Sequence, residues 1–407
     1  MKVRRIVTTG AASPGKRWAA VLAAVLAGGA CLTAAGAAQA APRPGQPGHD
    51  RPRPGLSSSP VPDTHLTAVS ADSATDAWAV GSYADSSQVS HSLTLHWNGS
   101  TWSRVTSPSP SRSTAGYGTY LLGVSAVSPT DAWAVGYYRN STGGAHPLIL
   151  HWNGSTWSRV TSPNPGGTHL LGVSAVSPTD AWAVGWYGAK ASLILHWNGS
   201  AWAQVANPSP GGALSGVSAD SATDAWAVGS YTTFSQVTYS LTLHWDGSAW
   251  AQVASPSPGG TSGTTLSGVS ADSATDAWAV GDSRVNPLIL QWNGSAWAQV
   301  ASPDPGGGYV ILLGVSAVSA TDVWAVGWYG SSTSLQALVL QWNGGTWAQV
   351  TIPTPLGATD SALSGVSTVS ATDAWAVGSY RTGTGASESF ILYWNGSAWK
   401  QVPSPSP

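Results

Sequence analysis

One short string recurs seven times along this chain, and its spacing constrains the fold more than any other feature. The string is Asp-Ala-Trp-Ala-Val-Gly, with a single Ala to Val change, and it begins at Asp76, Asp131, Asp180, Asp224, Asp276, Asp322 and Asp373. Successive copies lie 44 to 55 residues apart, so residues 64–407 divide into seven repeats of about 49 residues. A period of 40–50 residues with β-type content is typical of a repeat architecture whose units bury their cores against one another.

Each repeat contains four strand-like runs, which in the first copy cover residues 66–71, 76–83, 92–97 and 101–106. The third and fourth runs are joined by Asn98-Gly99, a dipeptide that favours a type I′ hairpin turn. Four antiparallel strands repeated seven times predict an all-β fold, a seven-bladed β-propeller of four-stranded antiparallel blades. A β-solenoid fits the hairpins poorly, and a series of sandwiches fits the constant period poorly.

The first 63 residues have a different composition. Residues 1–40 combine a basic start, an apolar run and Ala38-Gln39-Ala40, which predicts a signal peptide cleaved before Ala41. Arg4-Arg5 leaves twin-arginine export open as an alternative to the Sec route. Residues 41–63 are rich in Pro, Gly and Ser and predict a disordered linker. We therefore expect a secreted, extracellular protein without membrane insertion after cleavage, and without disulfides because Cys31 leaves with the signal.

Charge is scarce in the repeats and narrows the function classes. Only 8% of the chain is Asp, Glu, Lys or Arg, and residues 65–407 carry 8 basic and 16 acidic side chains. Nucleic-acid binding needs a basic stripe, which these repeats lack. Four repeats place a histidine at one equivalent position, but one histidine per blade is too widely spaced for a shared metal ion. We expect no metal and no cofactor.

Tryptophan is the other unusual residue. Three per repeat account for 21 of the 24, and Trp18 lies in the signal. Burying large aromatic rings offsets the cost of ordering the repeats, so the recurring tryptophans are predicted to form the core. Trp186 and Trp328 fall outside this pattern and are candidates for ligand binding.

The repeat resembles that of the Asp-box, or bacterial neuraminidase repeat, propellers and of the related photosystem II assembly-factor propellers. The resemblance rests on Trp78-Ala79-Val80-Gly81 and on the hairpin from Trp97 to Trp102, and it covers all seven repeats. It implies the propeller fold. It does not imply sialidase activity, because the family's sialidases need an arginine triad, a tyrosine nucleophile and a nearby glutamate, and Glu388 is the single glutamate here. Trp97 also stands where the box has its aspartate.

Loop lengths indicate where ligands would bind. The turns between runs one and two and between runs three and four are nearly constant, whereas the loops on the opposite face vary, and variable loops on a rigid scaffold commonly bind ligands. Aromatic and acidic residues lie at the end of the second run on that face. The predicted ligand-binding residues are Tyr83, Tyr137, Tyr138, Trp186, Tyr187, Tyr231, Asp282, Trp328, Tyr329 and Tyr380.

These features together predict a monomeric, non-enzymatic binding propeller that recognises glycans, since exposed Tyr and Trp beside small polar groups suit sugar rings. One alternative is a scaffold for extracellular proteins. Another is a polysaccharide lyase or glycosidase, for which the available groups are Asp282, Asp304, Asp360, Glu388 and His169.

Overall fold

The structure is a computed structural model that describes residues 63–111, 118–140, 143–306, 308–331 and 334–405. The predicted signal peptide and all but the last residue of the predicted linker lie outside these ranges. No helix in the described ranges has the length and apolar character needed to cross a membrane. Apart from one short turn of 3₁₀-helix, η1 (Gly260–Ser262), the regular structure in them consists of strands.

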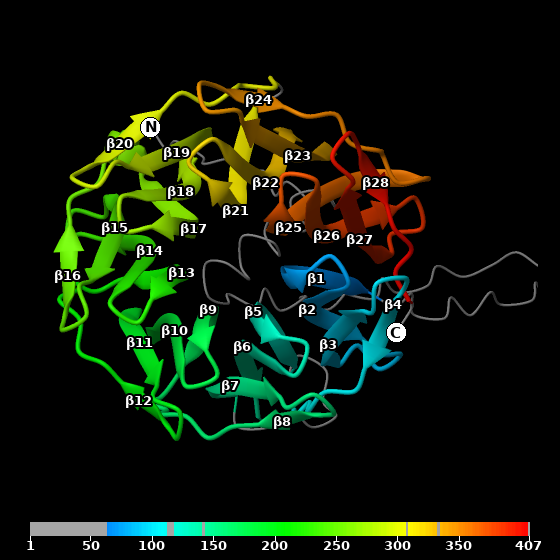
Figure 1. The fold of residues 1–407 in the computed structure, drawn as a ribbon, viewed down its shortest axis with the longest axis horizontal. Helices are drawn as coiled ribbons and strands as arrows, with labels where there is room; N and C mark the ends of the chain where they lie inside the picture. Colours follow the sequence, from blue (N-terminus) through cyan, green and yellow to red (C-terminus); the bar gives the residue numbers. More distant parts are fainter. Residues whose placement is uncertain (1–62, 112–117, 141–142, 307, 332–333, 406–407) are drawn as a thin grey trace, which may run out of the picture.

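Seven four-stranded antiparallel sheets stand around a central axis as the blades of a propeller, which confirms the predicted fold (Figure 1). The innermost strands are β1 (Thr64–Ser73), β5 (Thr119–Ser128), β9 (His169–Ser177), β13 (Ala213–Ser221), β17 (Thr264–Ser273), β21 (Tyr309–Ser319) and β25 (Ala358–Ser370). The second strands are β2 (Asp76–Ala84), β6 (Asp131–Arg139), β10 (Asp180–Tyr187), β14 (Asp224–Thr232), β18 (Asp276–Ser283), β22 (Asp322–Ser331) and β26 (Asp373–Thr382).

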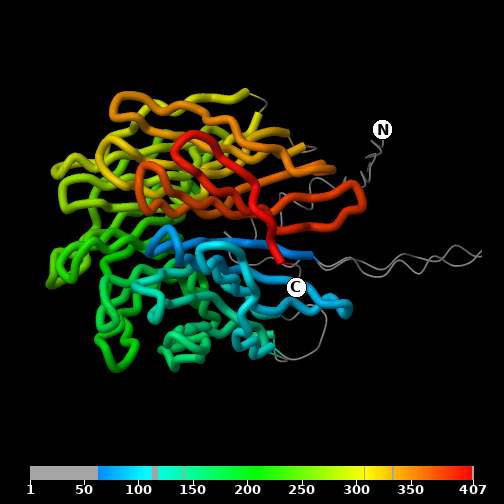
Figure 2. Tube along the Cα trace, turned by 45° about the vertical axis from the view of Figure 1, so that its right-hand side comes forward, coloured from blue at the N-terminus to red at the C-terminus, as the bar shows by residue number. Residues whose placement is uncertain are grey.

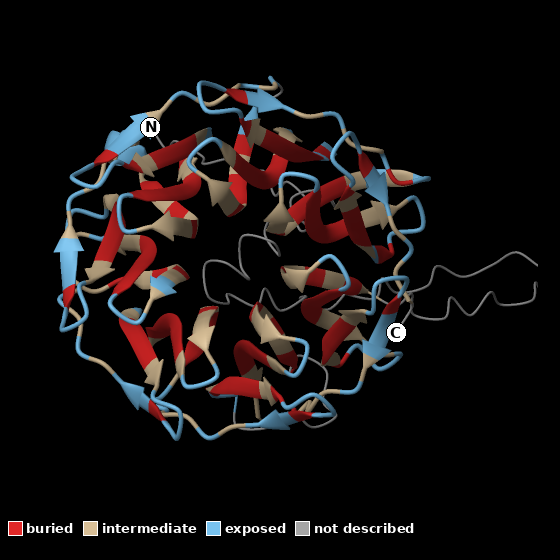
Figure 3. Cartoon of the chain, viewed as in Figure 1, coloured by how far each residue is buried: buried red, intermediate tan, exposed pale blue. Residues whose placement is uncertain are grey.

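The third strands are β3 (Ser90–Trp97), β7 (Ala145–Trp152), β11 (Ala191–Trp197), β15 (Thr238–Trp245), β19 (Asn286–Trp292), β23 (Ser334–Trp342) and β27 (Ser387–Trp394). The outermost strands are β4 (Trp102–Val105), β8 (Trp157–Arg159), β12 (Trp202–Gln204), β16 (Trp250–Val253), β20 (Trp297–Val300), β24 (Trp347–Gln349) and β28 (Trp399–Gln401). Burial depends on the place of a strand in its blade. The second and third strands are mostly buried, and the outermost strands are largely exposed (Figure 3).

The recurring Asp-Ala-Trp-Ala-Val-Gly string forms the second strand, and its two faces differ in size. Trp78 and Val80 pack against Ala132 and Ala134 of the next blade. The small face of the same strand, with Ala77, receives the tryptophan of the preceding blade. Large side chains therefore meet small ones at every blade interface, which is how close packing is reached in a repeated core.

The recurring tryptophans form one cluster at each interface. The second-strand tryptophan of one blade contacts both tryptophans of the next blade's outer hairpin, as Trp78 does with Trp152 and Trp157 at centroid distances of 4.8 and 4.9 Å. The last interface repeats this, since Trp375 contacts Trp97 and Trp102 of the first blade. All 21 tryptophans of the pattern belong to these seven clusters, which confirms the prediction that they form the core.

The glycine that ends the string is required by close contact with the inner strand. A Cβ atom on Gly81 would lie 1.9 Å from the backbone oxygen of His65, and the equivalent glycines have the same neighbour at 1.9 to 2.0 Å. The contact falls where the pairing of the first two strands shifts by one residue, for example between Leu66 and Ala68. No other residue fits there without moving the inner strand.

The hairpin between the third and fourth strands differs from the predicted type I′ turn. Trp97 pairs with Trp102, so the loop has four residues, and only Gly99 has a positive φ, of 89°. The side chain of Asn98 accepts hydrogen bonds from the backbone N–H groups of Ser100 and Thr101, both at 3.0 Å. This side-chain turn replaces the two-residue turn, because it satisfies the loop's donors and needs only one left-handed residue.

A belt of serine hydroxyls joins the inner strands. The Oγ of Ser70 accepts the backbone N–H of Ala126 in the next blade at 3.0 Å, and each following blade repeats the contact. Ser367 completes the ring with Ala71 at 3.0 Å. The first and last blades lie side by side (Figure 2), and Asp63 ties them, because its carboxylate accepts the N–H of Ser387. Asp63, assigned to the linker from its sequence, therefore belongs to the closure of the ring.

Candidate functional site

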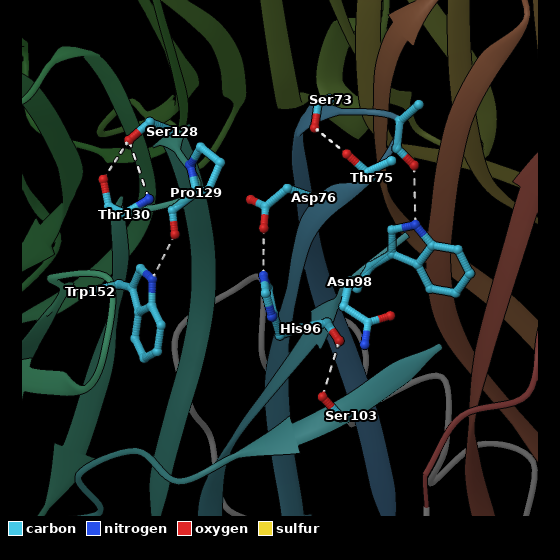
Figure 4. Close-up of polar contacts among 12 residues, drawn as sticks. Ser73, Thr75, Asp76, His96, Asn98, Ser103, Ser128, Pro129, Thr130 and Trp152 are labelled. Atoms are coloured by element: carbon cyan, nitrogen blue, oxygen red, sulfur yellow. Dashed lines mark hydrogen bonds and ion pairs between the residues drawn. The ribbon is translucent and has the colours of Figure 1, made fainter. Parts of the chain in front are cut away.

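The two faces of the propeller differ as the loop lengths predict. On the constant face, the turn between the first two strands and the outer hairpin are bound together, since Trp97 Nε1 donates to the backbone oxygen of Ala74 at 3.1 Å. Trp152 makes the same bond to Pro129 in the second blade (Figure 4). In the first blade this tight turn joins Ser73 to Asp76, which pair directly across the two strands.

The aspartate that opens the string binds a side chain of the third strand in the same blade. Asp76 pairs with Nε2 of His96 at 2.5 Å (Figure 4), and the imidazole stacks on Trp78 with centroids 4.4 Å apart. Gln291 or Tyr393 replaces the histidine in other blades. The contact therefore fixes the end of the third strand in each blade, and no cluster of three or more His, Cys, Asp or Glu residues arises among the described residues.

The predicted ligand-binding residues occupy two successive positions on the variable face. The first position follows the glycine of the string and holds Tyr137, Trp186, Asp282 and Trp328. The second position is one residue later and holds Tyr83, Tyr138, Tyr187, Tyr231, Tyr329 and Tyr380. Neighbouring residues of a strand face opposite sides of the sheet, so the two sets have different surroundings.

Trp186 and Trp328 are not the exposed platforms that the sequence predicts. Each retains only 6% exposure. Trp328 packs in a cluster with Leu313, Leu335 and Ala362, and Trp186 stacks on His169 with ring centroids 4.0 Å apart at 13°. They lie outside the three-per-blade pattern and yet are buried on the variable face. Their ring faces are already covered and are not free to stack on a sugar.

The stack around Trp186 continues toward the axis through Tyr137 and Tyr120, with centroid distances of 4.3 Å from His169 to Tyr137 and 5.1 Å from Tyr137 to Tyr120. Burial of His169 lowers its pKa to about 4, so the imidazole is neutral at pH 7. Asp282 holds the position equivalent to Trp186 and Tyr137 in blade 5. Its carboxylate accepts the hydroxyl of Thr265 at 2.5 Å, and burial raises its pKa.

The six tyrosines of the second position are half-buried. Their rings pack against the blade interfaces. In blades 1 and 2 the tyrosine hydroxyl accepts a hydrogen bond from an arginine of the outermost strand. Two of these tyrosines line cavities at the same place in their blades, beside the start of the third strand and the segment that follows the fourth. We call these cavities the rim pockets of blade 2 and blade 6.

The rim pocket of blade 2 has a volume of about 340 Å³ and is lined by Tyr138, His146, Pro147, Arg159, Thr161, Ser162 and Asn164. Tyr138 and His146 face each other across β6 and β7, with rings stacked at 5.1 Å and 23°. Arg159 donates to the hydroxyl of Tyr138 at 3.0 Å, and its guanidinium carbon lies 4.8 Å from the centre of that ring. The pocket thus combines an aromatic wall with a held cation and several small polar groups.

The rim pocket of blade 6 has a volume of about 400 Å³ and the same plan with different chemistry. Tyr329 donates to Gln336 at 2.7 Å, and these two residues are the counterparts of Tyr138 and His146. Gln349 stands in the strand position of Arg159. The lining includes a carboxylate, Asp360, and no Lys or Arg.

Blade 1 carries the residues of blade 2 with one change. Arg104 donates to Tyr83 at 2.6 Å and lies 4.3 Å over its ring, and His91 faces Tyr83 across the strands. Here Asp85 binds His91 at 2.9 Å, whereas blade 2 has Asn140 at that position, 2.8 Å from His146. The hydrogen bond from His91 lowers the pKa of Asp85.

In blade 7 the tyrosine meets the single glutamate. Tyr380 donates to Glu388 at 2.5 Å. Burial, with the adjacent carboxylate, raises the pKa of Tyr380 to about 12. A phenolate nucleophile is therefore disfavoured at this position.

The other groups considered for catalysis are dispersed in the structure. The carboxylate of Asp304 accepts the N–H of Gly306, and that of Asp360 accepts the N–H of Leu335. His169 contacts the backbone oxygen of Gly167. Among the described residues, no hydrogen bond or ion pair joins any two of Asp282, Asp304, Asp360, Glu388 and His169.

A third cavity, of about 420 Å³, lies on the axis. The inner strands line it with repeated Gly-Val pairs, such as Gly172-Val173 and Gly216-Val217, and its lining also includes Tyr83 and Tyr120. Its wall is mainly apolar. Glycine recurs there because the inner strands approach closely, and a Cβ on Gly123 would lie 3.2 Å from the backbone of Gly172.

Sequence reasoning identified the tyrosines of the rim but missed the residues that complete the pockets. Arg104, Arg159, His91 and His146 are scattered in the chain, and only strand register brings them to one place. A signal was available: each arginine is the third residue of a short run that begins with the recurring tryptophan, and each histidine stands eight residues after its tyrosine.

Comparison with known proteins supports the fold and leaves the family unassigned. No family model matches the chain, and no curated protein matches it. Among solved structures, "YCF48 bound to D1 peptide" is 15% identical, with a TM-score of 0.53, over 82% of this chain and 92% of that one. An ulvan lyase of polysaccharide lyase family PL25, bound to a saccharide, is 10% identical, with a TM-score of 0.54, over 83% and 95%. At these identities the similarity concerns the β-propeller fold alone.

Proposed function

We propose that this protein is a secreted binding propeller that recognises glycans through the rim pockets of its variable face. The observation that carries the proposal is the recurrence of one pocket plan in blades 2 and 6, with Tyr138 and Tyr329 as equivalent walls. A glycan has repeated, similar units, and near-equivalent shallow pockets around a rigid ring suit multivalent binding of such a ligand.

The chemistry of the pockets fits sugar rings. A half-buried tyrosine offers an apolar ring face together with a fixed hydroxyl. The pocket linings also contain hydrogen-bonding side chains that are exposed or partly exposed to solvent. They are Thr161 and Ser162 in blade 2, and Thr351 and Gln336 in blade 6. Volumes of about 340 and 400 Å³ are in the range of small-ligand sites.

A second candidate is a scaffold that binds an extracellular peptide or protein at the axial cavity. The apolar wall of that cavity favours it, since Leu66, Val124 and Leu171 belong to its lining. This candidate predicts that substitutions at Tyr120 weaken ligand binding and that substitutions in the rim pockets do not.

The experiment is a glycan array probed with the protein of residues 41–407. Glycan binding should fall when Tyr138 and Tyr329 are both changed to alanine and should persist in a Tyr120→Ala control. Absence of binding to every glycan, or binding that is lost only with Tyr120, would contradict the proposal and favour the second candidate.

A further inference from the structure

Resting on the proposed function, we infer that the rim pocket of blade 2 is specific for the anionic group, a carboxylate or a sulfate, of an acidic saccharide. The inference concerns the ligand class of this one pocket. It arises from Arg159, its fixed geometry and its difference from the equivalent positions in the other blades.

Arg159 is a cation held in place and left without an acidic partner. Its guanidinium is oriented by the 3.0 Å bond to the Tyr138 hydroxyl and by the Tyr138 ring 4.8 Å away. In the part of the chain that the structure describes, the only ion pairs join histidines to aspartates, and none involves an arginine. A guanidinium has five donors in a planar fork that matches a carboxylate or sulfate, and Tyr138 takes one of them.

His146 beside it is fixed as part of the wall. The side-chain amide of Asn164 lies 3.0 Å from Nδ1 of His146, while its oxygen accepts the N–H of Gly166 and the hydroxyl of Thr168. Those two bonds leave Asn164 as the donor to the imidazole. The ring is therefore preorganised, and a ligand that enters the pocket does not have to order it.

The other blades provide an internal comparison. Blade 1 repeats the arginine and histidine but adds the carboxylate of Asp85, which would repel an anion. Blade 6 has Gln349 in place of the arginine and includes Asp360 in its lining. Of the two rim pockets, only that of blade 2 contains a cation, and its lining contains no carboxylate. The repeats carry a net excess of acidic residues, whose long-range field repels anions, so the local cation of blade 2 is the feature that would favour an anion at this rim.

The test measures binding of three probes to the protein of residues 41–407 by calorimetry at low ionic strength. The probes are α-1,4-linked trigalacturonate, the neutral galactotriose of the same linkage, and that galactotriose sulfated at O6. At least one anionic probe should bind about tenfold more tightly than the neutral one, because a guanidinium–anion pair is a charge-assisted contact. The two anionic arms distinguish carboxylate from sulfate as the preferred group.

Two variants locate the effect. Arg159→Gln, which installs the residue of blade 6, should abolish the preference for the anionic probe, so that the anionic and neutral probes bind with similar affinity. Asn140→Asp, which installs the acid of blade 1, should reduce the preference for the anionic probe as well. Lys400→Gln removes the same charge from an exposed position of the outer strand β28 and serves as the control. Melting temperatures verify that each variant is folded.

The outcomes separate this inference from the proposed function. Equal binding of neutral and anionic probes, or an anionic preference that survives Arg159→Gln, overturns the inference and leaves glycan binding intact. Absence of binding to all three probes and across the glycan array overturns both.

Discussion

The hydroxyl of Ser367 in the last blade accepts a hydrogen bond of 3.0 Å from the backbone N–H of Ala71 in the first blade, 296 residues earlier in the chain. The other six blade interfaces have the same bond between inner strands. The ring therefore closes through the inner-strand bond that every blade makes, to which the contact of Asp63 with Ser387 is added. Each of the seven sheets consists of four strands that are consecutive in the chain.

We predict that Ser367→Ala and Ser218→Ala destabilise the protein by similar amounts, about 1 kcal/mol each, because each removes one hydrogen bond that joins two blades. In a chain of this length that corresponds to a fall in melting temperature of roughly 1–2 °C. Calorimetry of both variants measures this change, with Ser73→Ala, in a partly exposed turn, as a control. A large loss confined to Ser367→Ala would show that closure depends on a special contact.

Substituting the glycine of the recurring string should destabilise the protein more than removing one of these hydrogen bonds. A Cβ on Gly136 would lie 1.9 Å from the backbone oxygen of Tyr120, whereas one on Gly383 meets nothing within 4 Å. Gly136→Ala should therefore cost several kcal/mol, on the order of an overpacked core, and Gly383→Ala should be close to neutral. Thermal unfolding of the two variants compares them directly, and equal melting temperatures would refute the close contact.

Paired carboxyl groups predict a stability that depends on pH. Burial and the neighbouring Asp76 raise the pKa of Asp72 to about 6, and Asp272 behaves likewise beside Asp276. The folded state binds more protons than the unfolded state between pH 3.8 and about 6, so stability from these groups falls as pH rises through that window.

Four blades have valine at the positions of Asp72 and Asp272, as Val127 in blade 2 shows. Asp72→Val should therefore stabilise the protein at pH 7.5, by about 1 kcal/mol after allowance for partial exposure, and should have a smaller effect at pH 4. Melting temperatures at the two pH values check the sign. Destabilisation at pH 7.5 would mean that the second carboxylate is held by favourable contacts.

His169 has the opposite dependence. Its pKa is lowered to about 4 in the folded state, so the unfolded state binds the extra proton as pH falls below about 6.5. Stability should decline by on the order of 3 kcal/mol between pH 6.5 and pH 4. In His169→Ile, which installs the residue of the equivalent Ile311, this part of the decline should disappear. An unchanged pH profile would indicate that His169 is accessible to solvent.

The sequence repeats were sufficient to predict the blades, because seven copies of the same pattern support each strand assignment. The spacing of Trp78, Trp97 and Trp102 defined strand order and core at once. Trp186 and Trp328 show the limit of that reasoning. They break the three-per-blade pattern, which indicated exposed rings, yet both are buried, Trp186 against His169 and Trp328 against Leu335. Counting repeats does not reveal such neighbours.

The rim pockets show that prediction from the sequence also missed residues of the candidate site. Tyr138 could be predicted from its place at the end of a strand. Arg159 and His146 were not predicted, because they become neighbours of Tyr138 only through the pairing of three strands, although their recurring distances from the tryptophan and the tyrosine in the sequence offered a signal. Hydrogen bonds such as that between Asp76 and His96 also depend on this pairing, which placed the aspartate's partner 20 residues away instead of in the adjacent turn.

The most direct test of glycan recognition at the rim is a crystal structure of the protein with the tightest-binding saccharide from the array. We predict a sugar ring against Tyr138 in the blade 2 pocket, with a second copy against Tyr329 in blade 6 where the ligand is neutral. A saccharide seated in the axial cavity, with both rim pockets free of it, would contradict the account.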